Sequence, residues 1–276
     1  YKLDDLTPYL FKTTNYGKSW TLITDGIAEN DYTRVIREDP VRPGLLYAGT
    51  ETGLYLSFND GSSWRRWDSN FPVVPVRDMI VKDDDLVIAS HGRAFWIFDN
   101  LSVLRQTTPE VLSTSAHLFQ PENPYRFRES VWGSPLRGQS PMGASGKNPP
   151  AGAVIWYHLR NSGETVTLSF RDSKGDQVAT FSSQKDPNQI GTPRNPPPDP
   201  LKNKAGLNQF VWDLRYPGPL QIPGAIYRRY DPVGPIAPPG QYEVEMRVGK
   251  IRSSHSFEIL ADPRLFEDIK GEIKIK

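Results

Sequence analysis

The chain contains no cysteine among its 276 residues, and this absence excludes disulfides and thiolate metal sites. The absence of cysteine does not identify the cellular compartment, because a cysteine-free chain suits an oxidising space as well as a reducing one. Net charge is nearly absent too, since 33 basic and 32 acidic residues leave +1. The sequence therefore has no electrostatic footprint for an anionic membrane, and no nucleic-acid partner is expected.

Long hydrophobic runs are also missing. No stretch approaches the roughly 20 apolar residues that a transmembrane helix needs, so no transmembrane segment is expected in this chain. The first residue is Tyr1 rather than Met, and no basic-then-apolar signal segment follows it. We therefore expect a processed product, an engineered form, or part of a longer protein.

Turn-forming and aromatic residues are abundant. The chain has 26 prolines, 22 glycines and, adding 7 Trp, 12 Tyr and 12 Phe, 31 aromatic residues. This composition favours short strands and many turns over long helices. The length suits one large or two ordinary domains.

An eight-residue pattern occurs twice in the first third of the chain. Residues 13–20 read TTNYGKSW, residues 57–64 read SFNDGSSW, and a shift of 44 positions (15 to 59) superimposes them. The aligned pairs are Asn15 with Asn59, Gly17 with Gly61, Ser19 with Ser63 and Trp20 with Trp64. In such a turn we expect the Asn side chain to bond backbone N–H groups, the Gly to adopt a positive φ, and the Trp to be buried between neighbouring sheets.

The segments around this pattern indicate a β-propeller. Short alternating stretches such as 34–37 and 86–89 are separated by turn formers, and the unit is about 40–45 residues long. A third unit begins at Asp85, but no tryptophan motif follows it, which leaves about two and a half blades. Propellers usually have about 4–8 blades. Either a longer chain or a partner must then supply the missing ones.

A second β pattern begins at residue 151 and predicts an immunoglobulin-like β-sandwich. The whole chain is therefore predicted to be all-β: a partial propeller in residues 1–105, a proline-rich connector in 106–150, the sandwich in 151–262 and a tail in 263–276. The six predicted strands lie within residues 151–159, 164–171, 171–181, 206–215, 240–248 and 251–260.

We make separate predictions for several segments outside the strands. Tyr125, Phe127 and Trp132 are large for a free linker and predict a connector that is held on a surface. The proline-rich insertions 182–206 and 217–240 are either variable surface loops or docking arms. In the second case, the aromatic and basic residues Tyr227, Arg228, Arg229 and Tyr230 would contact the partner.

The search for catalytic chemistry finds little. The sequence has no GxSxG elbow, P-loop, GxGxxG or HExxH. The isolated candidates are weak: the spacing of His91, His117, His158 and His255 is not that of metal ligands, and Arg34, Arg77 and Arg93 suit solvated strand positions. The three carboxylates Asp83, Asp84 and Asp85 form a turn. Asn100 begins a short sequence of the glycosylation type, and no feature supports calcium binding at Asp172–Asp176. We therefore assign no catalytic, cofactor-binding or metal-ligating residue, and we expect no cofactor.

The repeated pattern S/T-x-D/N-x-G-x-S/T-W resembles the Asp-box, or BNR repeat, of sialidase-like and sortilin (VPS10)-like propellers, with Asn in place of Asp in both copies. The phrases NPPAGAVIWYHL, GLNQFVWDLR and PPGQYEVEMRVG resemble the C-terminal immunoglobulin-like module of large bacterial sortilin-like or BNR-repeat proteins. The resemblance implies an extracytoplasmic protein, periplasmic or at the cell surface, and implies little about chemistry.

Two classes of function follow as hypotheses. The first is a non-catalytic extracytoplasmic module that binds a protein partner or the remaining blades, in one version as an accessory subunit on the outer face of a larger membrane complex. The alternative is the C-terminal part of a sialidase-like glycoside hydrolase, or of a glycan-binding protein, whose active blades lie upstream. A sialidase needs an arginine cluster and paired acid–base groups, and no characteristic arginine motif is present.

Overall fold

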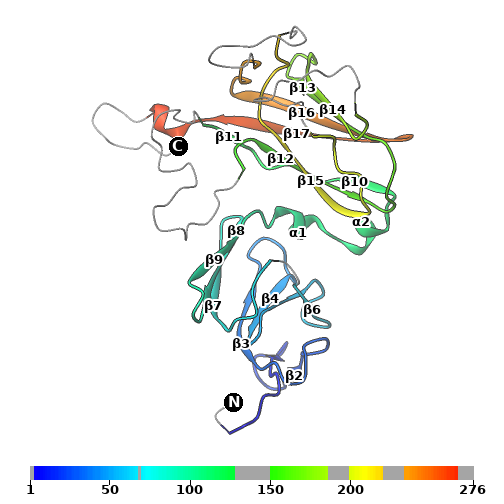
Figure 1. Ribbon diagram of the computed structural model, residues 1–276. Helices are drawn as coiled ribbons and strands as arrows, with labels where there is room; N and C mark the ends of the chain where they lie inside the picture. The colour runs from blue at the N-terminus through cyan, green and yellow to red at the C-terminus, as the bar shows by residue number, and fades with distance from the viewer. Residues whose placement is uncertain (1–2, 68–69, 128–149, 186–198, 220–232, 267–276) are drawn as a thin grey trace. The chain divides into compact units, whose positions relative to one another are not determined.

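The computed structural model describes residues 3–67, 70–127, 150–185, 199–219 and 233–266, and they are nearly all β-structure, as predicted (Figure 1). The chain divides into two compact units, residues 1–108 and 109–276. Helical structure is confined to three short segments in the described residues: α1 (Ser102–Gln106), α2 (Pro109–Ser113) and a 3-10 turn at Pro263–Phe266.

The first unit, coloured blue to teal in Figure 1, contains three antiparallel sheets that follow one another along the chain. The middle sheet has four strands in sequence order, the arrangement that the sequence predicts for a propeller blade. The sheets are β1 (Phe11–Lys12) with β2 (Thr21–Leu22); β3 (Thr33–Glu38), β4 (Leu46–Thr50), β5 (Leu54–Ser57) and β6 (Arg65–Arg66); and β7 (Val76–Lys82), β8 (Asp85–Ser90) and β9 (Phe95–Phe98).

The two central strands of the middle sheet, β4 and β5, are buried on both faces because they carry apolar residues at successive positions. On β4, Leu46 packs in one cluster with Leu10 of the preceding hairpin, whereas Tyr47 packs in a second cluster with Leu86 of the following sheet. A strand that is apolar on both sides fits between two other layers. The three sheets therefore pack face to face, with the middle one covered by its two neighbours.

The second unit is a two-sheet β-sandwich. All six strands predicted from residue 151 onward are confirmed, and they enclose one core that includes Trp212, Phe170 and Tyr157. One sheet has the order β10-β12-β15 and the other β11-β17-β16-β13-β14. The strands are β10 (Ala116–Leu118), β11 (Tyr125–Arg126), β12 (Ala153–Leu159), β13 (Val166–Asp172), β14 (Gln177–Ser182), β15 (Gly206–Trp212), β16 (Gly240–Val248) and β17 (Ile251–Ala261).

Part of the segment expected to be an extended connector is regular structure. Residues 109–127 form α2, β10 and β11; β10 pairs antiparallel with β12, and β11 pairs parallel with β17. Strands of two or three residues carry too little alternation to be recognised in a sequence, so only their pairing partners reveal them. Trp132, residues 227–230, most of the first proline-rich insertion and most of the tail lie outside the described residues.

Candidate functional site

The two repeated loops of the first unit share the same hydrogen bonds. In the first loop, the Thr13 hydroxyl accepts the Gly17 N–H at 2.9 Å and the Asn15 Oδ1 accepts the Ser19 N–H at 2.9 Å. In the second loop the corresponding bonds, Gly61 N–H to Ser57 and Ser63 N–H to Asn59, are also 2.9 Å. Gly17 and Gly61 have φ of 84° and 82°. The roles predicted for the Asn and Gly positions are confirmed.

The tryptophans that close these loops differ. Trp64 is 3% exposed, and its indole N–H donates to the Ile23 carbonyl of the preceding hairpin at 2.7 Å. Its backbone N–H also donates to the Asp25 carbonyl at 2.8 Å. Trp20, at the same position of the first loop, is 59% exposed. The expected burial between neighbouring sheets is therefore confirmed for Trp64 and wrong for Trp20.

Trp20 belongs to a larger apolar surface on β1 and β2, formed by Tyr9, Phe11, Trp20 and Leu22 and called here the hairpin face. Phe11 lies opposite Leu22 in the strand register, and Tyr9 stacks on Phe11 with ring centroids 6.3 Å apart. Since side chains alternate along a strand, Leu10 and Ile23 point to the other face, where they pack with Trp64. The hairpin is thus apolar on both faces, and only one of them is covered.

The third sheet shows the same asymmetry on its outer face. Phe95 and Ile97 are 75% and 57% exposed, and Ile80 on β7 is exposed as well. Trp96 and Phe98, which alternate with them on β9, instead pack against Phe71, with ring centroids 5.4 and 5.9 Å away. Exposed contiguous apolar residues commonly mark interaction surfaces.

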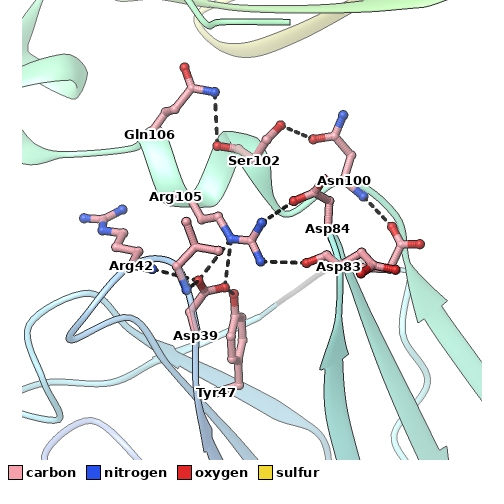
Figure 2. Close-up of polar contacts among 11 residues, drawn as sticks. Asp39, Arg42, Tyr47, Asp83, Asp84, Asn100, Ser102, Arg105 and Gln106 are labelled. Atoms are coloured by element: carbon pink, nitrogen blue, oxygen red, sulfur yellow. Dashed lines mark hydrogen bonds and ion pairs between the residues drawn. The ribbon is translucent and has the colours of Figure 1, made fainter. Parts of the chain in front are cut away.

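A polar network in the first unit joins helix α1 to the two sheets beside it (Figure 2). Arg105 extends from α1 and donates to both carboxylate oxygens of Asp39, to the carboxylate of Asp84 and to the backbone carbonyl of Asp83. The Tyr47 hydroxyl donates to Asp39 at 2.9 Å. We call this set the Arg105 clamp: Asp39, Tyr47, Asp83, Asp84 and Arg105.

The Asp39–Arg105 pair at the centre of the clamp is charged but closed to solvent, whereas the side chains of Asp83 and Asp84 are 79% and 55% exposed. The side chain of Asp39 is 0% exposed and that of Arg105 9% exposed. Burial alone would raise the pKa of Asp39, but the N–H groups of Arg42 and Val41, the Tyr47 hydroxyl and the Arg105 guanidinium hold it below its usual range. Burial, followed by the bond to Asp39, raises the pKa of Tyr47. A buried ion pair whose hydrogen bonds are satisfied connects α1 to the middle sheet.

Sequence reasoning missed Arg105 and Asp39, and the equivalence that points to Arg105 depends on where two strands end in the structure. Strand β5 ends at Ser57 and β9 at Phe98, a shift of 41 residues, and the same shift places Arg105 at the position of Trp64. The third sheet is therefore followed by a short helix and an arginine whose side chain is 9% exposed, where the middle sheet is followed by the loop and its tryptophan.

The arginines singled out from the sequence are not gathered into one site. Arg34 pairs with Glu51 after β4, whereas Arg77 contacts the ring of His91 after β8 at 3.2 Å. Both arginines lie at register shifts of their strands, which makes them equivalent positions of successive sheets. The carbonyl of Arg93 accepts the indole N–H of Trp96.

Three of the four histidines come close together in the sandwich. His117 and His158 are paired across β10 and β12, and the ring of His255 contacts the Leu118 carbonyl at 3.0 Å. Burial, together with the charges of His255 and His158, lowers the pKa of His117; burial lowers that of His158. As predicted, His158 and His255 lie in sandwich strands.

The described residues offer no group of three or more His, Asp or Glu side chains placed to hold a metal ion. At the turn where calcium was considered, Asp172 accepts the backbone N–H groups of Lys174 and Asp176, as in an ordinary capped turn. Asn100 accepts a hydrogen bond from the Ser102 hydroxyl. Within the same described ranges, no helix has the length and apolarity to cross a membrane.

Comparison with known proteins adds little. No family model matches the chain, and no curated protein matches it. Among solved structures, it is similar at 12% identity and a TM-score of 0.27 to the extracellular domain of a protein described as a one-component system from B. thetaiotaomicron. The match covers 92% of this chain and 28% of that one, so the chain spans less than a third of that structure.

Proposed function

We propose that the chain is a non-catalytic extracytoplasmic module that binds another protein through the exposed apolar faces of its first unit. One observation carries the proposal: the end sheets expose residues whose counterparts in the middle sheet are buried. Phe11 and Trp20 are 55% and 59% exposed, against 2% and 3% for their counterparts Tyr55 and Trp64. Leaving such side chains in water costs hydrophobic free energy that a partner would recover.

The extracytoplasmic part of the proposal has separate support. The loops at 13–20 and 57–64 resemble the Asp-box of sortilin-like and BNR-repeat propellers in sequence, and their hydrogen bonds are the same in both copies. This resemblance to sortilin-like and BNR-repeat propellers implies a protein that acts outside the cytoplasm. In a more specific version of the proposal, the chain is an accessory subunit that docks on the outer face of a membrane complex.

Site-specific photo-crosslinking tests the binding proposal. Benzoylphenylalanine replaces Phe11 or Phe95 in the protein expressed in its source cells, and Tyr16, which is fully exposed on the tip of the first loop, serves as the matched control. We expect one defined protein adduct from position 11 or 95 and none from position 16. The purified partner should then bind the unmodified chain and lose about tenfold or more in affinity to Phe11→Ser. Equal adducts from all three positions, or none, would contradict the proposal.

A glycan-binding or glycoside hydrolase role is the second candidate. The observation in its favour is an exposed aromatic pair in the second unit, Tyr125 and Phe127, which are 46% and 48% exposed with ring centroids 5.5 Å apart. A glycan array distinguishes the roles: retention that Phe127→Ala abolishes would indicate a lectin, and hydrolysis of the retained glycan would indicate an enzyme. The protein-binding proposal expects neither.

A further inference from the structure

The middle sheet of the first unit shows what the β1–β2 hairpin would need in a complete blade. The shift of 44 residues places β1 on β5 and β2 on β6. Strand β5 pairs with β6 on one edge and with β4 on the other, and β4 pairs in turn with β3. In the described part of the chain, β1 pairs with β2 alone. The hairpin therefore lacks the two inner strands of its blade, and within the described residues no strand pairs with the second edge of β1. Just before β1, the Thr33 hydroxyl accepts the Tyr9 N–H and donates to the Tyr9 carbonyl.

The same alignment shows what covers the hairpin face when a neighbouring sheet is present. Trp64 lies on the connection 23–27 of the preceding hairpin, whose Ile23 and Asp25 carbonyls accept its two N–H groups. Gly26 is required there, since a Cβ on it would approach the Trp64 carbonyl oxygen to 2.2 Å. Ile27 completes the apolar contact. The receiving segment thus has the pattern apolar-x-x-Gly-apolar, with two free carbonyls.

We propose that the hairpin face is the docking site for another antiparallel β-blade. That blade supplies one strand that pairs with the second edge of β1, a further strand that pairs with the first strand, and a connection of the apolar-x-x-Gly-apolar type that receives Trp20. This inference rests on the proposed function and specifies the partner. Backbone pairing at an open sheet edge and an apolar face beside it are a recurrent mode of protein recognition.

A second copy of this chain does not fit the site in the same way. The connection 23–27 of that copy is already occupied by its own Trp64. The next connection, with Trp67 and Phe71, is covered by Phe98, whose ring centroid lies 4.2 Å from that of Trp67. In the described residues of the first unit, moreover, each inner strand already pairs within its own sheet. The contact that receives Trp64 is therefore not available in a second copy, and the occupant that we propose is a blade from outside residues 1–108.

The repeat itself provides a probe of known chemistry. A copy of residues 9–52 inserted before Tyr9 adds one 44-residue period: two inner strands for β1, and a 23–27 connection placed to receive Trp20. Because the chain contains no cysteine, a single Phe11→Cys substitution in the original copy reports exposure of the hairpin face by its rate of thiol labelling. We expect the inserted period to slow labelling about tenfold or more, since a docked segment must open before the thiol reacts.

Phe95→Cys on β9 is the matched control, and its labelling rate should be the same with and without the insertion. A shorter insertion of residues 31–52, which supplies only the inner strands, is measured in parallel. The proposal is overturned if labelling at position 11 stays fast in both extended chains, or if both insertions lower the unfolding midpoint. Concentration-dependent protection of position 11 in the unextended chain would overturn it as well, because a second copy would then be the occupant.

The failure of this inference is separable from failure of the proposed function. A photo-crosslinked partner at position 11, combined with fast labelling in the extended chains, would leave a protein-binding module whose partner is not a blade. The absence of any adduct, combined with slow labelling in the extended chains, would leave a face able to receive a blade but no separate binding protein.

Discussion

The Nε atom of Arg105 lies 3.0 Å from each carboxylate oxygen of Asp39 and donates its hydrogen to them, across 66 positions of the chain. Asp39 follows β3 in the middle sheet, and Arg105 lies on α1, which follows the third sheet. The carboxylate also accepts the N–H groups of Val41 and Arg42. The pair therefore ties the end of the first unit to its middle sheet and satisfies a charge that has no access to water.

Replacing Arg105 with methionine should destabilise the first unit by about 3–5 kcal/mol, because the Asp39 carboxylate would stay buried without its cation. Urea unfolding of the full chain measures the change. Arg37→Met is the control: Arg37 forms an ion pair with Asp78 at 2.6 Å, but both side chains are largely exposed, and such pairs contribute at most about 1 kcal/mol. Similar costs for the two variants would show that burial does not set the strength of the clamp.

The lowered pKa of Asp39 predicts a loss of stability in acid. The unfolded carboxyl binds a proton at a higher pH than the folded one, so this contribution is complete above the unfolded pKa of about 4 and is lost as the pH falls through the folded value. Unfolding free energies at pH 6 and pH 3 should therefore differ less in Asp39→Asn than in the unsubstituted chain. Equal pH dependence in the two proteins would refute the assignment.

Trp64 and Trp20 form a matched pair for alanine substitution. Trp64→Ala should cost about 3–5 kcal/mol because it opens a cavity beside Ile23 and removes the bond to its carbonyl. Trp20→Ala should stay within about 0.5 kcal/mol in the isolated chain, since its ring is 59% exposed. Chemical denaturation of both variants gives the comparison, and a large cost at Trp20 would mean that the hairpin face is already covered in solution.

Gly26 and Gly92 separate backbone strain from lack of space. Their φ values are 91° and 90°, but a Cβ at Gly26 would lie 2.2 Å from the Trp64 carbonyl oxygen, whereas at Gly92 nothing lies within 4 Å. Gly92→Ala should therefore cost about 1–2 kcal/mol, the penalty of the left-handed conformation. Gly26→Ala should cost clearly more and should expose Trp64, with a red-shifted fluorescence. Equal costs would exclude the steric argument.

The sandwich should lose stability between pH 7 and pH 5. The pKa values of His117 and His158 are lowered by burial, so the unfolded state binds protons that the folded state excludes. Stability is then complete above the unfolded pKa of about 6.5 and falls with acidity, by at most about 1.4 kcal/mol per pH unit for each proton. The slope should be smaller in His158→Leu, measured by urea unfolding at several pH values. An unchanged slope would assign the effect to other groups.

The sequence alone determined the features that depend on local order. Alternating strands, the glycines at positive φ and the Asn15 and Asn59 turns are set by residues within a few positions of one another, so they could be predicted without coordinates. The two tryptophans could be predicted to have the same role for the same reason. The all-β fold class, and the six strands of the sandwich, followed from these local patterns.

Only the tertiary structure decided which of those positions meet a neighbour. Trp20 and Trp64 have the same local motif and opposite exposure, because burial depends on whether another sheet lies beside the loop. Arg105 and Asp39 are 66 positions apart, and no short sequence pattern predicts that they pair. Contacts between distant segments arise from the packing of whole sheets, which is why the hairpin face and the Arg105 clamp became visible only in the folded chain.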